Sequence, residues 1–143
     1  MLKKKGEFRI RVIYADTDAM GIVYHANYIK WFEVGRAELM REIGIIYSEL
    51  EALGYKLPVT KIGCHYFLPA KYDDVLVIET EITGLKQASI RFDYVISDEK
   101  KEKVLAEGFT LHPFINKDGK VARVPHDIAD KIKDSVHYKS TKS

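Results

Sequence analysis

The stretch of sequence that decides the fold is Tyr14-Ala15-Asp16-Thr17-Asp18-Ala19-Met20-Gly21-Ile22-Val23-Tyr24-His25-Ala26-Asn27-Tyr28. Before it, Phe8, Ile10 and Val12 occupy every second position, as in a strand with one buried face. After it, apolar residues recur at helical spacing. The chain therefore changes from extended to helical in a segment that holds two acids, a glycine and a histidine.

A carboxylate just ahead of a helix N-terminus is well placed for chemistry. The free N–H groups of the first turn can hold a developing oxyanion, and the helix dipole favours negative charge there. We therefore interpret the stretch as the active site, with Asp16 and Asp18 as candidate acids. Spacing alone leaves open that both acids only cap the loop, because Asp is a preferred N-cap residue.

The helix is expected to begin at about Tyr24 and to end before Gly44, a residue type common just after a helix. Its buried side is predicted to carry Tyr28, Trp31, Phe32, Gly35, Leu39, Met40 and Ile43. Gly35 should cost about 1 kcal/mol relative to alanine in mid-helix. We expect a packing reason for it, namely a helix that lies close on a sheet.

The remaining chain reads mainly as strands. Ser48 and Glu51 fit a capping box that opens a short second helix, which Gly54 ends. The predicted strands cover residues 57–68, 75–83, 89–96 and 104–115, with a short strand at 121–124 and a final helix at about 126–136. Strands joined by short turns pair antiparallel. The sequence therefore predicts one α+β domain over residues 1–143, with its core at about 7–125.

Composition narrows the class of protein. The chain has 143 residues, 46% of them hydrophobic, and a net charge of +2 that is too small to suggest nucleic acid as a partner. No apolar run approaches the ~20 residues of a membrane helix, and no signal peptide is expected. Cys64 is the only cysteine, which excludes an internal disulfide and fits the reducing cytoplasm. We expect it to be a buried space-filling residue.

Residues 16–28 resemble the signature of the 4-hydroxybenzoyl-CoA thioesterases, and most of all their YbgC-like acyl-CoA thioesterase branch, which is associated with the Tol-Pal system. Supporting similarity lies at residues 32–33, 69–74 and 79–83, and the resemblance covers about residues 8–125. It implies a hotdog fold, in which a curved antiparallel β-sheet wraps around one long central helix. It also implies dimers with a continuous sheet, often paired into a homotetramer, and active sites at the dimer interface.

The resemblance also implies roles for individual residues. The catalytic carboxylate falls on Asp18, and the backbone N–H that polarises the thioester carbonyl falls at His25. No cofactor and no metal are needed. Gly21, Val23, Tyr24, Asn27 and Tyr28 are the candidate substrate-binding residues, and Lys86 is a candidate contact for the phosphates of coenzyme A.

Met20 departs from the family pattern, in which a small residue is common, and it could reshape the acyl pocket. The turn at residues 86–88 also has fewer basic residues than some relatives carry. Association with Tol-Pal or an acyl carrier protein is implied by the resemblance only.

Other interpretations of these residues remain open or are weaker. Asp16 is expected to be structural, and the His25 side chain could line the substrate or carry a proton. The pattern from Asp16 to Gly21 imitates a calcium loop, but its fifth position is Met20 and its twelfth is Asn27, where oxygen ligands are required. The spacing of His65, His112 and His126 does not suggest zinc. Glu33 is expected to be a buried or interface polar contact.

Three functions are weighed for this sequence. The first is a hydrolase that converts short-chain or aromatic acyl-CoA to the free acid and coenzyme A. In it, one carboxylate either attacks the thioester or activates a water. The alternative is a non-catalytic hotdog module that binds acyl-CoA or a protein. A dehydratase acting on 3-hydroxyacyl thioesters would need a His/acid pair, whereas the segment around Asp18 follows the thioesterase pattern.

Overall fold

The computed structural model describes residues 6–135 and residue 138. The strands are β1 (Gly6–Arg11), β2 (Lys61–Tyr66), β3 (Val75–Leu85), β4 (Ser89–Asp98) and β5 (Val104–Pro113). The helices are α1 (Ala26–Glu42), α2 (Tyr47–Ala52) and α3 (His126–Lys133), and a single 3₁₀ turn, η1, spans Tyr14–Asp16.

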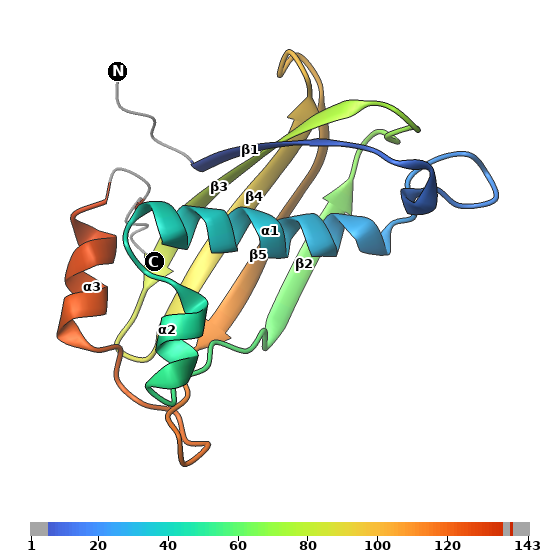
Figure 1. The fold of residues 1–143 in the computed structure, drawn as a ribbon. Coiled ribbons are helices and arrows are strands. Elements are labelled where there is room, and N and C mark those ends of the chain that lie inside the picture. The colour runs from blue at the N-terminus through green and yellow to red at the C-terminus, as the bar shows by residue number, and fades with distance from the viewer. Residues whose placement is uncertain (1–5, 136–137, 139–143) are drawn as a thin grey trace.

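All five strands form one antiparallel sheet in the order β1-β3-β4-β5-β2. Helix α1 lies across one face of this sheet, with α2 and α3 beyond the ends of the strands (Figure 1). The predicted α+β hotdog architecture is therefore confirmed. Two strands, β1 and β2, form the free edges of the sheet.

The core lies between α1 and the sheet. The buried residues of α1 are Tyr28, Trp31, Phe32, Gly35, Leu39 and Met40, as the helical spacing predicts. Phe32 stacks on Tyr94 of β4 with ring centroids 4.3 Å apart. The predicted reason for Gly35 is confirmed, because a Cβ there would lie 2.5 Å from Oγ1 of Thr80 in β3.

Several predicted boundaries are wrong. β2 begins at Lys61 rather than near residue 57, where Pro58 has no N–H to extend the ladder. Helix α2 begins at Tyr47, so Ser48 lies inside it and no side chain caps its start. Residues 121–124 form only an isolated bridge, from Val121 to Ile115. α3 ends at Lys133, and residue 136 lies outside the described residues.

No helix in the described part of the chain combines the length and the apolar character needed to cross a membrane.

Candidate active site

The loop between β1 and α1 folds into a small hairpin that carries Asp18. Thr17 and Val23 form a bridge across it, and the N–H of Asp18 donates to the carbonyl of Ile22 at 2.8 Å. Gly21 turns the chain with a φ of +80°, a value that favours glycine. The N–H of Met20 donates to Oδ1 of Asp18 at 2.8 Å. The other carboxylate oxygen, Oδ2, has no hydrogen-bond partner among the described residues.

Two further contacts fix the hairpin to the body of the protein. Ile22 forms a bridge with Lys71, and the N–H of Val23 donates to the carbonyl of Ala70 at 2.9 Å. The segment that enters β3 therefore holds the hairpin immediately ahead of α1.

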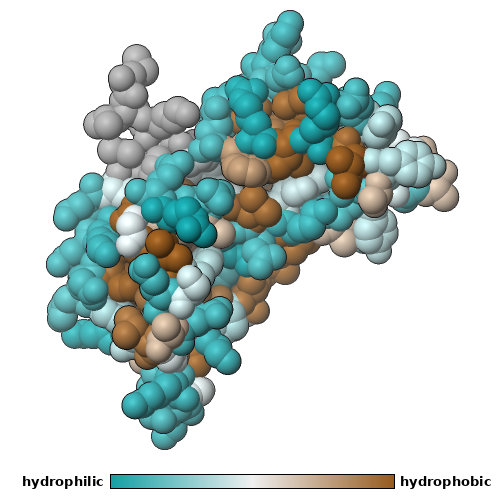
Figure 2. All heavy atoms as spheres, in the orientation of Figure 1, coloured by the Kyte–Doolittle hydropathy of each residue, from teal (hydrophilic) through white to brown (hydrophobic). Residues whose placement is uncertain are grey.

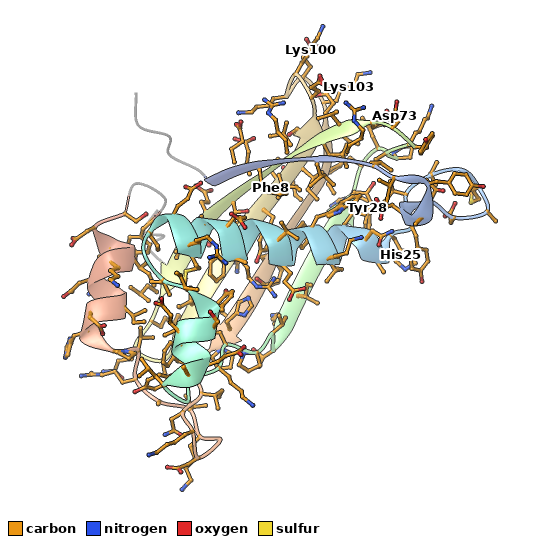
Figure 3. All side chains as sticks on the ribbon, viewed as in Figure 1. Phe8, His25, Tyr28, Asp73, Lys100 and Lys103 are labelled. Carbon is orange, nitrogen blue, oxygen red and sulfur yellow. The ribbon has the colours of Figure 1, made fainter. Side chains whose placement is uncertain are left out.

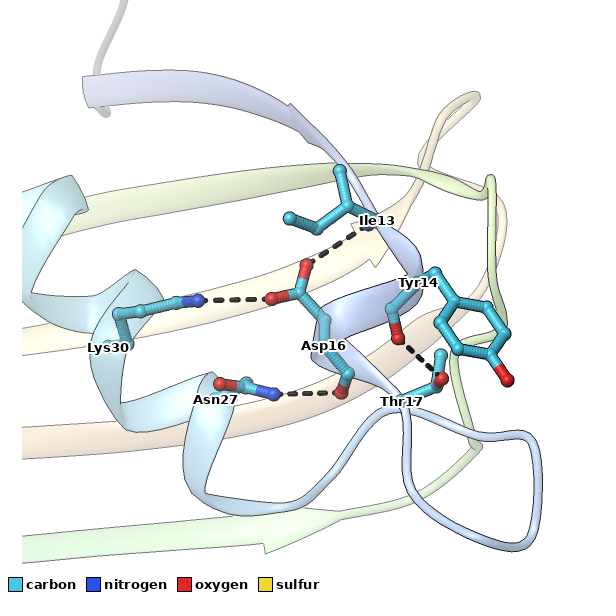
Figure 4. A network of polar contacts seen from close by, with 6 residues as sticks. All are labelled: Ile13, Tyr14, Asp16, Thr17, Asn27 and Lys30. Atoms are coloured by element: carbon cyan, nitrogen blue, oxygen red, sulfur yellow. Dashed lines mark hydrogen bonds and ion pairs between the residues drawn. The ribbon is translucent and has the colours of Figure 1, made fainter.

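Asp16 has a structural environment. Its side chain is buried, Oδ2 accepts the N–H of Ile13 at 3.1 Å, and Oδ1 lies 3.1 Å from Nζ of Lys30 (Figure 4). Its carbonyl accepts the Asn27 side-chain amide at 2.8 Å and the N–H of Tyr24 at 2.9 Å. Asp16 thus connects the end of β1 to the first turns of α1, which agrees with its predicted role.

The start of α1 offers free hydrogen-bond donors. His25 is the N-cap residue and is already helical, with φ −55° and ψ −33°. Its own N–H and that of Ala26 donate to no protein group in the described part of the chain. The N–H of Asn27 and that of Tyr28 donate to the carbonyls of Tyr24 and His25, respectively. Two adjacent donors are therefore available for an oxyanion.

An apolar pocket of about 290 Å³ adjoins this helix start. Its lining residues are Ile22, Val23, His25, Tyr28, Tyr66, Phe67, Leu68 and Pro69. The rings of Tyr28 and Tyr66 meet edge to face, with centroids 5.0 Å apart. Burial raises the pKa of both phenols, and for Tyr66 a hydrogen bond with Cys64 raises the pKa further. Figure 3 shows His25 and Tyr28 at this end of α1.

The structure brings only some of the predicted site residues to this pocket. Val23, His25 and Tyr28 line it. Asp18 does not line it, but it pairs in the hairpin with Ile22, which does.

Three predicted substrate-binding residues lie away from the pocket wall. Gly21 is the exposed turn of the hairpin, and the Tyr24 side chain is 47% exposed. The Asn27 amide is occupied by the Asp16 carbonyl. Met20 is 81% exposed at the hairpin tip, so within one chain it does not narrow the pocket.

Lys86 lies in the turn between β3 and β4, at the opposite end of the sheet from the Asp18 hairpin. β3 alone has 11 residues, or about 33 Å of extended chain. A second pocket of about 280 Å³ is found there, and its charged lining residues are all basic or histidine: Lys86, Arg123, His126 and Lys133. Within a single chain this cationic pocket cannot serve the Asp18 hairpin.

Sequence reasoning missed the wall formed by Tyr66, Phe67 and Leu68. All three are between 41% and 48% exposed at the end of an edge strand. The available signal in the sequence was three consecutive apolar residues, which break the two-residue alternation of the strand. Cys64, two residues before Tyr66, is half-buried and not fully buried as predicted. This partial burial raises the pKa of its thiol. Among residues 6–135 and 138, no three His, Cys, Asp or Glu side chains gather as metal ligands.

Glu33 lies apart from the apolar pocket. It lines a smaller cavity of about 160 Å³ together with Arg36 and Tyr47, between α1 and α2.

Comparison with known proteins places this geometry in a family. A model described as the thioesterase-like superfamily matches residues 12–132. A putative esterase of Aquifex aeolicus is 32% identical over 127 residues, covering 89% of this chain and 97% of that protein. The acyl-CoA thioester hydrolase YbgC of Escherichia coli O6:H1 is 41% identical over 83 residues, covering 58% of this chain and 62% of YbgC.

Solved structures agree. The hypothetical protein TT1821 from Thermus thermophilus has a TM-score of 0.85 at 33% identity, covering 90% of this chain and 97% of that one. A DHNA-CoA thioesterase from Staphylococcus aureus has a TM-score of 0.83 at 28% identity, covering 90% and 91%. Named relatives thus support acyl-CoA thioester hydrolase activity. The chain belongs to the thioesterase-like superfamily of hotdog proteins.

Proposed function

We propose that this protein hydrolyses short-chain or aromatic acyl-CoA thioesters, with Asp18 as the catalytic carboxylate. The observation that carries the proposal is the pair of free N–H groups at His25 and Ala26, beside an apolar pocket and the hairpin that bears Asp18. The pocket wall includes the rings of Tyr28, Tyr66 and Phe67, which suit a small aliphatic or aromatic acyl group.

The reaction follows from this arrangement. The thioester oxygen accepts hydrogen bonds from the N–H groups at the start of α1, which stabilise the negative charge that develops on it. In the general-base route, Asp18 takes a proton from water as hydroxide adds to the carbonyl carbon. The tetrahedral intermediate then expels the coenzyme A thiolate, which takes the proton back. In the nucleophilic route, Asp18 attacks the carbonyl carbon and expels the coenzyme A thiolate, and water then cleaves the acyl anhydride to the free acid and the Asp18 carboxylate. One oxyanion donor contributes roughly 3–4 kcal/mol.

We further propose that two copies pair through β2. This edge strand presents unpaired backbone groups. The strand and the residues that flank it also carry exposed apolar side chains, namely Val59, Ile62, Tyr66, Phe67 and Leu68. Figure 2 shows hydrophobic residues along this margin of the molecule. Antiparallel pairing of β2 with its symmetry mate extends the sheet and buries this apolar strip. Pairing of such dimers gives the tetramer that the resemblance implies.

The dimer would bring the cationic pocket of one copy to the active site of the other. Because a two-fold axis at β2 reverses the strands, the β3–β4 turn of the second copy faces the Asp18 end of the first. About 3.5 strand spacings, or ~17 Å, separate that turn of the second copy from β2 of the first copy. The pantetheine arm of coenzyme A has about 13 bonds, or ~15 Å when extended. Lys86 would then contact the phosphates, as the family resemblance implies.

A free-thiol assay over a panel of acyl-CoAs tests the activity. We expect release of coenzyme A from short-chain or aromatic substrates. Tight binding of the same thioesters without release would instead identify an acyl-CoA-binding module. The single free Cys64 is compatible with an enzyme of the reducing cytoplasm, where acyl-CoA is available.

A further inference from the structure

We infer that Tyr66 is a positioning residue for the oxyanion-binding N–H groups. It acts through the backbone of His25 and not on the substrate carbonyl itself. The catalytic part of this inference rests on the proposed thioesterase function, whereas its structural part can be measured without any substrate.

Tyr66 is the last residue of the edge strand β2 and lies opposite Ala106 of β5. Its phenol donates to the carbonyl oxygen of His25 at 2.9 Å. Its ring packs edge to face on Tyr28 at 5.0 Å and on His25 at 6.4 Å between centroids. The hydroxyl is therefore held at the helix start by contacts of its ring with two residues there.

The hydrogen bond acts on the peptide group that carries a free donor. The carbonyl of His25 and the N–H of Ala26 belong to one planar peptide unit. A bond that fixes the carbonyl therefore fixes the direction in which the Ala26 N–H points. It also polarises the unit, because linked hydrogen bonds strengthen one another. Tyr66 thus makes the Ala26 N–H both better oriented and a stronger donor.

The helix start needs such support. No side chain caps α1, and the N–H of Tyr28 reaches the His25 carbonyl only at a long 3.3 Å. The first turn of a helix is the part most prone to fray. Because β2 is also the strand proposed to pair with a second copy, the same strand would support both the dimer and the oxyanion site.

The test is Tyr66→Phe, which keeps the ring contacts and removes the hydroxyl, and with it the bond to His25 and the hydrogen bond with Cys64. We expect kcat for an acyl-CoA substrate to fall roughly 3- to 10-fold, the scale of one neutral hydrogen bond, with KM changed less than about twofold. In a ¹⁵N-labelled sample, the Ala26 amide proton should shift upfield and exchange faster with solvent. Sedimentation should confirm that the variant keeps the assembly state of the parent.

Tyr94→Phe is the matched control, because it removes a buried phenol that bonds to Thr110 Oγ1 at 2.6 Å and lies away from the helix start. It should lower the melting temperature and leave kcat and the Ala26 amide unchanged. An unchanged Ala26 amide in Tyr66→Phe would overturn the structural part. A parent-like kcat together with a shifted amide would overturn the catalytic part. If the parent cleaves no acyl-CoA, the proposed function fails while the amide measurement still decides the positioning.

Discussion

Nζ of Lys30 lies 3.1 Å from Oδ1 of Asp16, and this ion pair links the second turn of α1 to the loop before it. The N–H of Ile13 occupies the other carboxylate oxygen of Asp16. Among the described residues, Asp18, two positions later, uses only Oδ1, for the N–H of Met20. The two acids of the motif therefore differ in what remains available for chemistry.

Asp18→Asn keeps the size of the side chain and removes its charge. We expect at least ~100-fold lower turnover with nearly unchanged substrate binding, the scale of a lost general base, and a larger loss for a nucleophile. Steady-state kinetics and binding of an unreactive acyl-CoA thioether measure the two effects.

Asp16→Asn is the matched control for that experiment. It weakens the ion pair with Lys30 and should lower stability by about 1 kcal/mol, with only a modest effect on activity. Thermal melts of both variants check this. An inactive Asp16 variant together with an active Asp18 variant would reverse the assignment of the catalytic and structural acids.

The proposed dimer predicts that a charge on β2 disrupts assembly. Ile62 is 41% exposed near the start of the edge strand, so Ile62→Lys should shift the protein toward monomer and lower activity together. Sedimentation equilibrium at micromolar concentration measures the shift. Val121→Lys, at a position 64% exposed and outside the sheet, should change neither quantity. A fully active monomer would contradict the shared site.

If the cationic pocket holds the phosphates of coenzyme A, removing its charges should weaken the binding of coenzyme A esters selectively. Lys86→Gln combined with Arg123→Gln should raise KM for acyl-CoA roughly tenfold, because two phosphate contacts are lost. Thioesters of N-acetylcysteamine lack the phosphates, so their hydrolysis should be unaffected. Lys100→Gln combined with Lys103→Gln, in the β4–β5 turn at the other end of the sheet, removes the same number of charges and serves as the control (Figure 3). Equal effects on both substrates would show that the pocket does not hold the phosphates.

His112 predicts how stability depends on pH. It is fully buried, with Nδ1 3.0 Å from the carbonyl of Leu57 and Nε2 2.7 Å from Oγ1 of Thr110. Burial, with a smaller contribution from Arg36, lowers its pKa to about 4 from the usual 6.5. As pH falls from 6.5 toward 4, the unfolded chain binds a proton that the folded chain excludes. The unfolding free energy should therefore fall, by about 3 kcal/mol at pH 4 from this group.

Urea unfolding at pH 7, 6 and 5 measures that loss, and carboxylates add to it mainly below pH 5. His112→Gln can keep the hydrogen bonds but does not titrate, so its stability should decline less over the same range. Parallel curves for the two proteins would show that His112 is not the group responsible.

Local sequence patterns were sufficient for much of this protein. The 3.6-residue period of α1 and the two-residue period of the strands predict which side of each element is apolar, and a sheet curled against one helix buries those sides together. Asp18 and the helix start are adjacent in the chain, so the sequence alone could place them together. Gly35 in mid-helix likewise predicted a close contact between the helix and the sheet.

The tertiary structure decided what depends on distant parts of the chain. Tyr66 reaches His25 across 41 residues of sequence, and no local pattern connects a residue in an edge strand to a helix N-terminus. Lys86 and Arg123 meet in one pocket, far from Asp18, only because β3 runs the full length of the sheet. The sequence by itself predicted most of the elements and the residues of the motif. The order of the strands decided which residues surround that motif, because long-range pairing brings together residues that no spacing rule relates.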